Sequence, residues 1–128
     1  MLNVFDIVLK SPKFKKILGL LYTDILTVKE RAKISKPNGS TGFEEVVVLE
    51  NQPCKLSFSS LNTTNQNDAT AQIVQVTKLF CDNEINIKPG SKIIIQRDGE
   101  TFEYSQSGLP GIFPNHQEIV LVPFEKYA

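Results

Sequence analysis

His116 is the only histidine in this sequence of 128 residues, and it is the side chain best suited to acid–base chemistry near neutral pH. Acid–base catalysis and nucleophile activation most often use a histidine beside a nucleophile or a carboxylate. The sequence contains no Gly-x-Ser-x-Gly motif that would supply a serine nucleophile. We therefore interpret His116 as a residue that fixes a loop by hydrogen bonds. A hydrolase that uses His116 is the distant alternative.

The two cysteines, Cys54 and Cys81, have neither CxxC spacing nor a cluster of histidines around them. Zinc needs several converging ligands and calcium needs a defined spacing of acidic residues, and the sequence offers neither pattern. The P-loop and the Rossmann fingerprint are absent as well. We expect no catalytic residue, no metal and no cofactor. Both cysteines are interpreted as small buried hydrophobic residues in a reducing cytoplasm, with a single disulfide as the alternative.

Positive and negative side chains balance in this sequence, since Lys plus Arg and Asp plus Glu both number 14. Proteins that grip nucleic acid phosphates usually carry a basic excess, because each neutralised phosphate releases counterions. A dedicated DNA- or RNA-binding module is therefore disfavoured. The hydrophobic content of 41% suffices for one core, and the length suits one domain. No segment predicts a targeting signal or a membrane span, so we expect a soluble cytosolic protein.

Residues 1–22 predict an N-terminal arm with a short amphipathic helix. Ser11-Pro12 is typical of a helix start, and apolar residues then follow at helical spacing. The helix either packs on its own domain or docks on a neighbouring subunit. A basic cluster lies largely on its other side and either faces solvent or contacts DNA phosphates or an acidic partner. The apolar residues are Phe14, Ile17, Leu18 and Leu21, and the basic ones are Lys10, Lys13, Lys15 and Lys16.

Residues 23–128 predict an all-β domain, a small antiparallel β-barrel or sandwich with long loops. Apolar and polar residues alternate with period two, and turn-rich connections separate the alternating runs. The run 36–42 is dense in turn formers, and Pro53 is expected to break the chain between two strands. The expected strands cover residues 26–34, 44–49, 54–58, 73–81, 92–97, 100–104 and 118–122.

The dipeptide Asp98-Gly99 predicts the turn of a β-hairpin, because these residue types suit the positive φ angles of a type I′ turn. A two-residue turn there sets the register of the flanking strands. It places Arg97 opposite Glu100, Ile95 opposite Phe102 and Ile93 opposite Tyr104.

Residues 59–72 form a long connection between two expected strands. The segment has one charged residue, Asp68, one large apolar residue, Leu61, and no glycine or proline. Uninterrupted loops of this length are uncommon and tend to be functional or disordered. It is interpreted either as a flexible surface loop or as a loop that becomes ordered only against other chains.

The C-terminal third carries a distinctive order of motifs. Pro89-Gly90-Ser91-Lys92 precedes the isoleucine-rich hairpin with Phe102-x-Tyr104, and Gly108-x-Pro110 and His116-Gln117-Glu118-Ile119 follow. In this order the sequence resembles the head-closure proteins (head-completion or stopper proteins) of long-tailed bacteriophages that infect Gram-positive bacteria. The resemblance covers about residues 44–124 and is best over 89–121. The N-terminal forty or so residues carry little of it.

The resemblance implies a small β-barrel, with twelve copies in a ring below the portal and its adaptor. The ring would sit in the neck of the virion after assembly in the host cytoplasm, without a membrane. Packaged double-stranded DNA would pass through it, and tail completion or terminator proteins would attach below. A loop of each subunit would project into the channel and hold the DNA until infection. Here that loop would comprise Ser59, Ser60, Leu61, Asn62, Thr63, Thr64, Asn65, Gln66, Asn67 and Asp68. The lysine-rich N-terminal helix has no counterpart in the family pattern and is interpreted as an arm that contacts the adaptor ring. Partner docking is therefore expected at Lys13, Lys15, Lys16 and His116.

A binding module of the SH3 or OB type, for peptide or single-stranded nucleic acid, is the alternative function. Such modules present clustered aromatic side chains on an exposed face. The aromatic residues of the β region are mostly scattered singly along the sequence, which suits a core better. We therefore expect a structural assembly protein in preference to a binding module.

Overall fold

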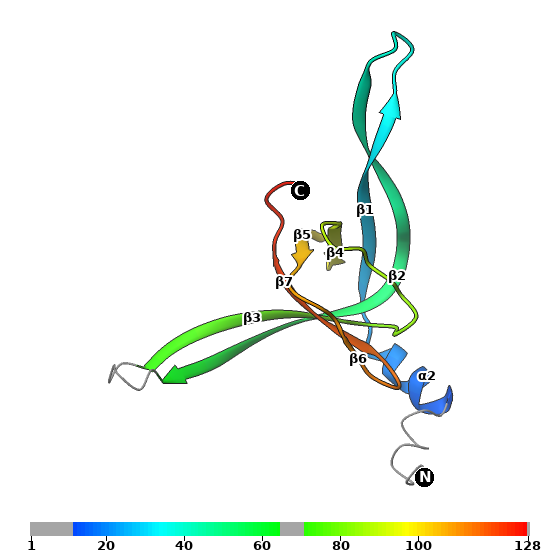
Figure 1. The fold of residues 1–128 in the computed structure, drawn as a ribbon. Helices are drawn as coiled ribbons and strands as arrows, with labels where there is room; N and C mark the ends of the chain where they lie inside the picture. The colour runs from blue at the N-terminus through cyan, green and yellow to red at the C-terminus, as the bar shows by residue number, and fades with distance from the viewer. Residues whose placement is uncertain (1–11, 65–70, 128) are drawn as a thin grey trace, which may run out of the picture.

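Six strands of the computed structural model join into a closed antiparallel barrel, as the alternating pattern predicted (Figure 1). The structure describes residues 12–64 and 71–127. Hydrogen bonding runs around the barrel in the order β1-β2-β3-β7-β5-β4 and returns to β1, with the short β6 added beside β7. The elements are α2 Pro12–Leu20, β1 Asp24–Ser35, β2 Thr41–Thr64, β3 Ala71–Cys81, β4 Lys92–Arg97, β5 Glu100–Gln106, β6 Gly111–Ile112 and β7 Gln117–Pro123.

The core lies inside the barrel and follows the predicted alternation. Leu26 and Val28 of β1 are buried, whereas Ala32 and Ile34 on the same side of the strand are only partly buried. The burial differs because the outer half of β1 extends beyond the barrel, where β1 no longer pairs with β4. The buried hydrophobic residues are Leu26, Val28, Cys54, Leu56, Leu79, Cys81, Ile87, Ile93, Ile95, Ile119 and Leu121.

The β4–β5 hairpin has the register that the Asp98-Gly99 turn predicted. Arg97 pairs with Glu100, and Ile93 pairs with Tyr104. Both turn residues have positive φ, 49° at Asp98 and 80° at Gly99. These angles are those of a type I′ turn, whose twist matches that of the flanking strands.

The expected break at Pro53 is wrong, because β2 is one strand of 24 residues that contains it. Its first part pairs with β1 and its second part, from Cys54, pairs with β3. Asn51 has φ 57° and lies where the register with β1 shifts between Leu26 and Val28, so a bulge absorbs the change of direction. The bulge lets the strand change partner without ending.

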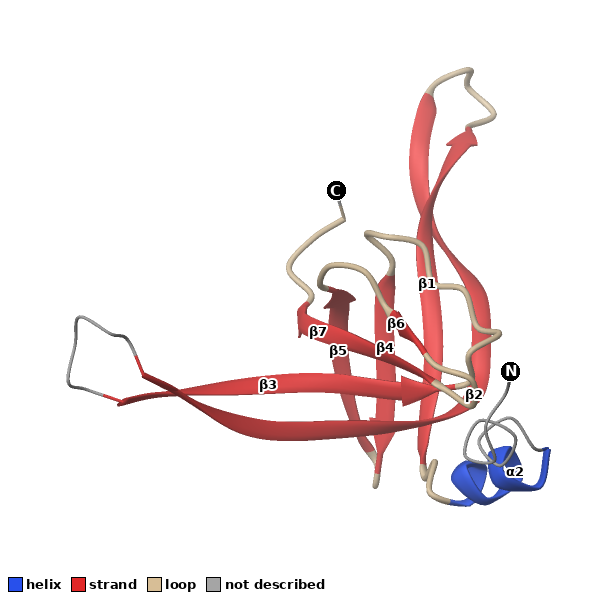
Figure 2. Ribbon diagram, turned by 60° about the horizontal axis from the view of Figure 1, so that its bottom comes forward, coloured by secondary structure: helices blue, strands red, loops and turns tan. Residues whose placement is uncertain are grey.

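Two β-hairpins extend from the barrel in different directions because β2 is shared between them (Figures 1 and 2). One comprises the outer parts of β1 and β2 and turns at residues 36–40. The other comprises the outer parts of β2 and β3. We call them the β1–β2 arm and the β2–β3 arm.

The predicted N-terminal helix is present as α2, which lies beside one end of the barrel (Figure 2). Leu18 is partly buried, but Ile17 and Leu21 are exposed. Ser11, the expected N-cap, lies outside the described residues. No helix in the described ranges has the length and apolar character that crossing a membrane requires.

Candidate functional site

The segment predicted as a channel loop forms most of the β2–β3 arm. The prediction of an irregular loop is wrong for Ser59, Ser60, Leu61, Asn62, Thr63 and Thr64, which are strand residues of β2. They pair in continuous register with β3, from Ser59 opposite Val76 to Thr64 opposite Ala71. Asn65, Gln66, Asn67 and Asp68 lie outside the described residues.

The absence of glycine and proline in this segment explains why the ladder continues. Nothing between Ser59 and Thr64 prevents a backbone N–H from donating to the partner strand. Residues 59–64 of β2 are polar apart from Leu61, so polar residues stand at successive positions along the strand. The alternation that reveals a half-buried strand is therefore missing, and the sequence resembles a loop.

The β2–β3 arm leaves the barrel at a defined point. The pairing of β3 with β7 begins at Thr77, which lies opposite Leu121. Before Thr77, the only strand that pairs with β3 among the described residues is β2. Ser59 and Ser60 are exposed at this place. The arm is thus a two-stranded ribbon, which in water gains little stability of its own.

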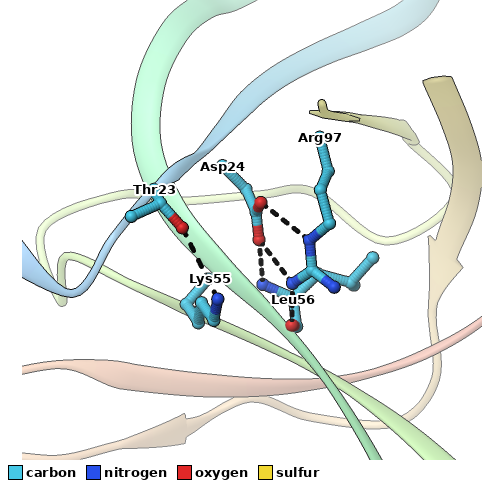
Figure 3. Close-up of polar contacts among 5 residues, drawn as sticks. All are labelled: Thr23, Asp24, Lys55, Leu56 and Arg97. Atoms are coloured by element: carbon cyan, nitrogen blue, oxygen red, sulfur yellow. Dashed lines mark hydrogen bonds and ion pairs between the residues drawn. The ribbon is translucent and has the colours of Figure 1, made fainter. Parts of the chain in front are cut away.

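An ion pair between a buried aspartate and a partly buried arginine lies at the base of this arm (Figure 3). Asp24, the first residue of β1, is 1% exposed and forms two hydrogen bonds with Arg97 at the end of β4. Arg97 Nε donates to Asp24 Oδ1 at 2.8 Å, and a terminal guanidinium nitrogen donates to Oδ2 at 2.8 Å. Leu56 of β2 completes the cluster: its backbone N–H donates to Asp24 Oδ2 at 2.8 Å, and its carbonyl accepts from Arg97. The cluster ties β1, β2 and β4 together where the arm begins.

The electrostatics of the cluster follow from this geometry. The hydrogen bonds from Arg97 hold the pKa of Asp24 below its usual range, and the same pairing raises the pKa of Arg97. Burial raises the pKa of the neighbouring Cys54 and Cys81 thiols to about 12. Both cysteines are free and buried, as the sequence indicated. The base of the arm is therefore held by an ion pair, and the two thiols near it stay protonated at neutral pH.

The Asp24–Arg97 pair is not predicted from the sequence, although the sequence carries one signal for it. Asp24 lies two residues before Leu26, so strand alternation places it on the core-facing side. An acidic residue on that side needs a buried partner, because an unpaired buried carboxylate is costly.

His116 lies in a hydrogen-bonded and stacked turn before β7. Its ring contacts Asn115 Oδ1 through Nδ1 at 2.5 Å and Glu118 Oε2 through Nε2 at 3.0 Å. The ring stacks on Phe113 with centroids 4.8 Å apart and on Phe80 at 6.0 Å. These contacts agree with the interpretation of His116 as a residue that fixes a loop.

The turn around His116 is also bound to the connection that follows β3. Gln117 is buried, and its side-chain amide donates to the carbonyls of Asp82 and Ile85 at 2.7 and 2.5 Å. Asn83 donates to the carbonyls of Phe113 and Pro114. The turn is therefore held rigidly on the barrel.

The expected docking residues lie at the same end of the barrel. A hollow there is lined by Gly19 and Tyr22, at and just after the end of α2, and by Asn115, next to His116. Lys16 of α2 is exposed, and nothing is described of the Lys13 and Lys15 side chains. Within the described ranges, no group of three or more His, Cys, Asp or Glu side chains is placed to hold a metal ion.

Comparison with known proteins gives limited similarity. No family model matches the sequence, and no curated protein matches it. Among solved structures, the chain is similar to the phage-like element PBSX protein xkdH from Bacillus subtilis. The TM-score is 0.47 at 15% sequence identity, and the match covers 77% of this chain and 91% of that chain.

Proposed function

We propose that this protein is a head-closure protein of a long-tailed bacteriophage. Copies would form a ring below the portal and its adaptor, close the DNA channel after packaging and provide the surface to which the tail attaches. The observation that carries the proposal is the β2–β3 arm, a ribbon that extends from a small closed barrel and whose described outer residues carry no charge. The motif order of residues 89–121 supports the same function.

The chemistry of the arm suits a channel that must close and reopen. Its described outer residues, 59–64 and 71–76, carry no charge. Lysine or arginine in their place would bind DNA phosphates and resist ejection, because each phosphate contact adds affinity through counterion release. Serine, threonine and asparagine can instead form hydrogen bonds with neighbouring arms without holding the DNA tightly.

The base of the arm suits the same task. The Asp24–Arg97 pair and Leu56 fix the direction in which β2 leaves the barrel. Arg97 also lies over the ring of Phe58, 5.8 Å from its centroid, and Phe58 is the first exposed residue of β2 in the arm. A fixed base would let identical arms of a ring point toward one axis.

The remaining parts of the proposal concern partners and place. Lys13, Lys15, Lys16 and His116 would contribute to docking on the adaptor above or the tail completion protein below. The protein would act in the virion neck without a cofactor and without catalysis. The binding-module alternative gains no support from the exposed aromatic residues, because Phe43, Phe58 and Phe113 lie on separate parts of the fold.

Shortening the β2–β3 arm tests this function. Residues 60–75 are replaced by Asn-Gly, which joins the cross-strand partners Ser59 and Val76 through a two-residue turn. We expect phage heads that assemble and fill, but lose DNA before tails attach. Packaged DNA per head is measured by nuclease sensitivity.

A matched control shortens the other arm. Replacing residues 33–43 by Asn-Gly joins Ala32 and Glu44, which are also cross-strand partners. This variant should retain its DNA. Full DNA retention in the β2–β3 variant, or equal leakage from both variants, would contradict the proposed channel function.

A further inference from the structure

Helix α2 and the residue that follows it present an apolar face that the rest of the described chain leaves exposed. Ile17, Leu20 and Leu21 follow the i, i+3, i+4 spacing of one helix face and are 50%, 76% and 61% exposed. Within the described part of the chain, α2 makes no extensive contact with any strand. A helix of nine residues is too short to be stable alone in water, so its apolar face needs a partner.

A second group of exposed apolar residues lies in and beside β6. Leu109 and Ile112 are 90% and 61% exposed, and Phe113 next to them is also exposed. The patch is rigid because β6 pairs with β7 and the Phe113 N–H donates to the carbonyl of His116 at 2.9 Å. A rigid patch binds a partner without first paying for its own ordering. We call these three residues the β6 patch.

The two apolar surfaces carry opposite charges at their margins. Lys16 adjoins the exposed face of α2, and Lys13 precedes it by one helical turn in the sequence. Glu84 is exposed. It lies near the β6 patch, since the side chain of the preceding Asn83 donates hydrogen bonds to the carbonyls of Phe113 and Pro114. Basic margins on one surface and an acidic margin on the other favour their association.

We infer that α2 docks on the β6 patch of a neighbouring copy of this chain. The same chain carries both halves of the contact and leaves both exposed, so the occupant that fits each surface is a second copy. A contact between two different surfaces of identical subunits is head-to-tail, and such contacts form a ring when the rotation between neighbouring subunits closes. The inference rests on the proposed function in that it assigns one contact of the proposed ring.

Cysteine cross-linking between separate copies tests the contact. Leu20→Cys and Ile112→Cys are made in separate full-length chains and mixed with a short bifunctional thiol reagent. The native Cys54 and Cys81 are buried and free, so the introduced thiols react selectively. We expect cross-linked dimers in the mixture and none with either variant alone. Dimers from Leu20→Cys alone or from Ile112→Cys alone, or no dimer in the mixture, would overturn the inference.

Charge reversal provides a second and independent readout. Lys16→Glu in the Leu20→Cys chain should lower the cross-linking yield about tenfold, the effect of a change of about 1.4 kcal/mol in contact energy. Glu84→Lys in the Ile112→Cys chain should restore it. Lys36→Glu, at the tip of the β1–β2 arm, is the matched control and should change nothing. A yield that Glu84→Lys does not restore would overturn the assigned pairing. DNA retention tests the β2–β3 arm and does not involve α2. A failed cross-link with normal DNA retention would therefore contradict the inferred contact and leave the proposed function standing.

Discussion

At the scale of single residues, the Asp24–Arg97 pair is the contact whose loss should cost most. The Asp24 side chain is 2% exposed, so removal of its partner leaves a buried carboxylate without compensation. We expect Arg97→Ala to lower the free energy of unfolding by about 3 kcal/mol. Chemical denaturation followed by circular dichroism measures this value.

Arg97→Lys is the control for charge alone. It keeps the positive charge but cannot donate two parallel hydrogen bonds to the carboxylate and another to the Leu56 carbonyl. The free energy of unfolding of Arg97→Lys should lie between those of the native protein and Arg97→Ala. Equal stability of all three proteins would show that the pair does not anchor the fold.

The lowered pKa of Asp24 predicts a specific dependence of stability on pH. Because its pKa is depressed in the folded state, the ionised carboxylate stabilises the fold above the usual pKa of about 4, and this contribution is lost as the pH falls through the folded-state pKa. We compare the native protein with Asp24→Asn by denaturation at a series of pH values. The native protein should be more stable from pH 5 to 8, and the difference should shrink below about pH 4. If the difference in unfolding free energy between the two proteins stayed constant down to acid pH, the ionised Asp24 carboxylate would not be the source of the stability.

His116 is predicted to be a structural residue. His116→Ala removes two side-chain hydrogen bonds and the stacking on Phe113, and we expect a loss of about 1–2 kcal/mol in unfolding free energy. His116→Phe keeps the stacking and loses only the hydrogen bonds, so it should lose less. Native stability in His116→Ala, together with the loss of a hydrolytic activity, would support the enzyme alternative instead.

At the scale of elements, the arms are expected to add little to the stability of the barrel. In the β2–β3 arm Phe58, Ser59 and Ser60 are exposed, and the buried core ends at Leu56 of β2 and Leu79 of β3. We therefore expect replacement of residues 60–75 by Asn-Gly to change the unfolding free energy by less than about 1 kcal/mol, since a shorter connection also costs less entropy to close. Thermal denaturation checks this directly, and a variant that fails to fold would show that the arm belongs to the core.

The elements predicted correctly from the sequence are those that local chemistry determines. The Asp98-Gly99 turn fixed the β4–β5 register because the turn type follows from two adjacent residues. The course of β2 could not be predicted in this way, since it depends on Asn51 and on two different partner strands. The burial of Asp24 left a signal in the strand alternation, but its partner could not be predicted in this way, because Arg97 is 73 residues away and meets Asp24 only when β1 and β4 pair.

At the scale of the whole molecule, the exposed apolar surfaces predict weak self-association in isolation. The inferred contact of α2 with the β6 patch involves a nine-residue helix and a two-residue strand. The area that such a contact can bury is small compared with the roughly 1,200–2,000 Å² that stable protein interfaces bury. We expect the isolated protein to sediment mainly as a monomer and to form its ring on an assembled portal and adaptor.

Sedimentation velocity over a range of protein concentrations measures this property. A monomer with a slight, concentration-dependent rise in sedimentation coefficient agrees with weak head-to-tail contacts between copies. Lys16→Glu should remove that rise, and Lys36→Glu should leave it unchanged, because the two lysines lie on α2 and on the distant β1–β2 arm. A stable free dodecamer would contradict assembly on a template. It would mean that the exposed faces of the barrel bind each other more strongly than their small apolar area predicts.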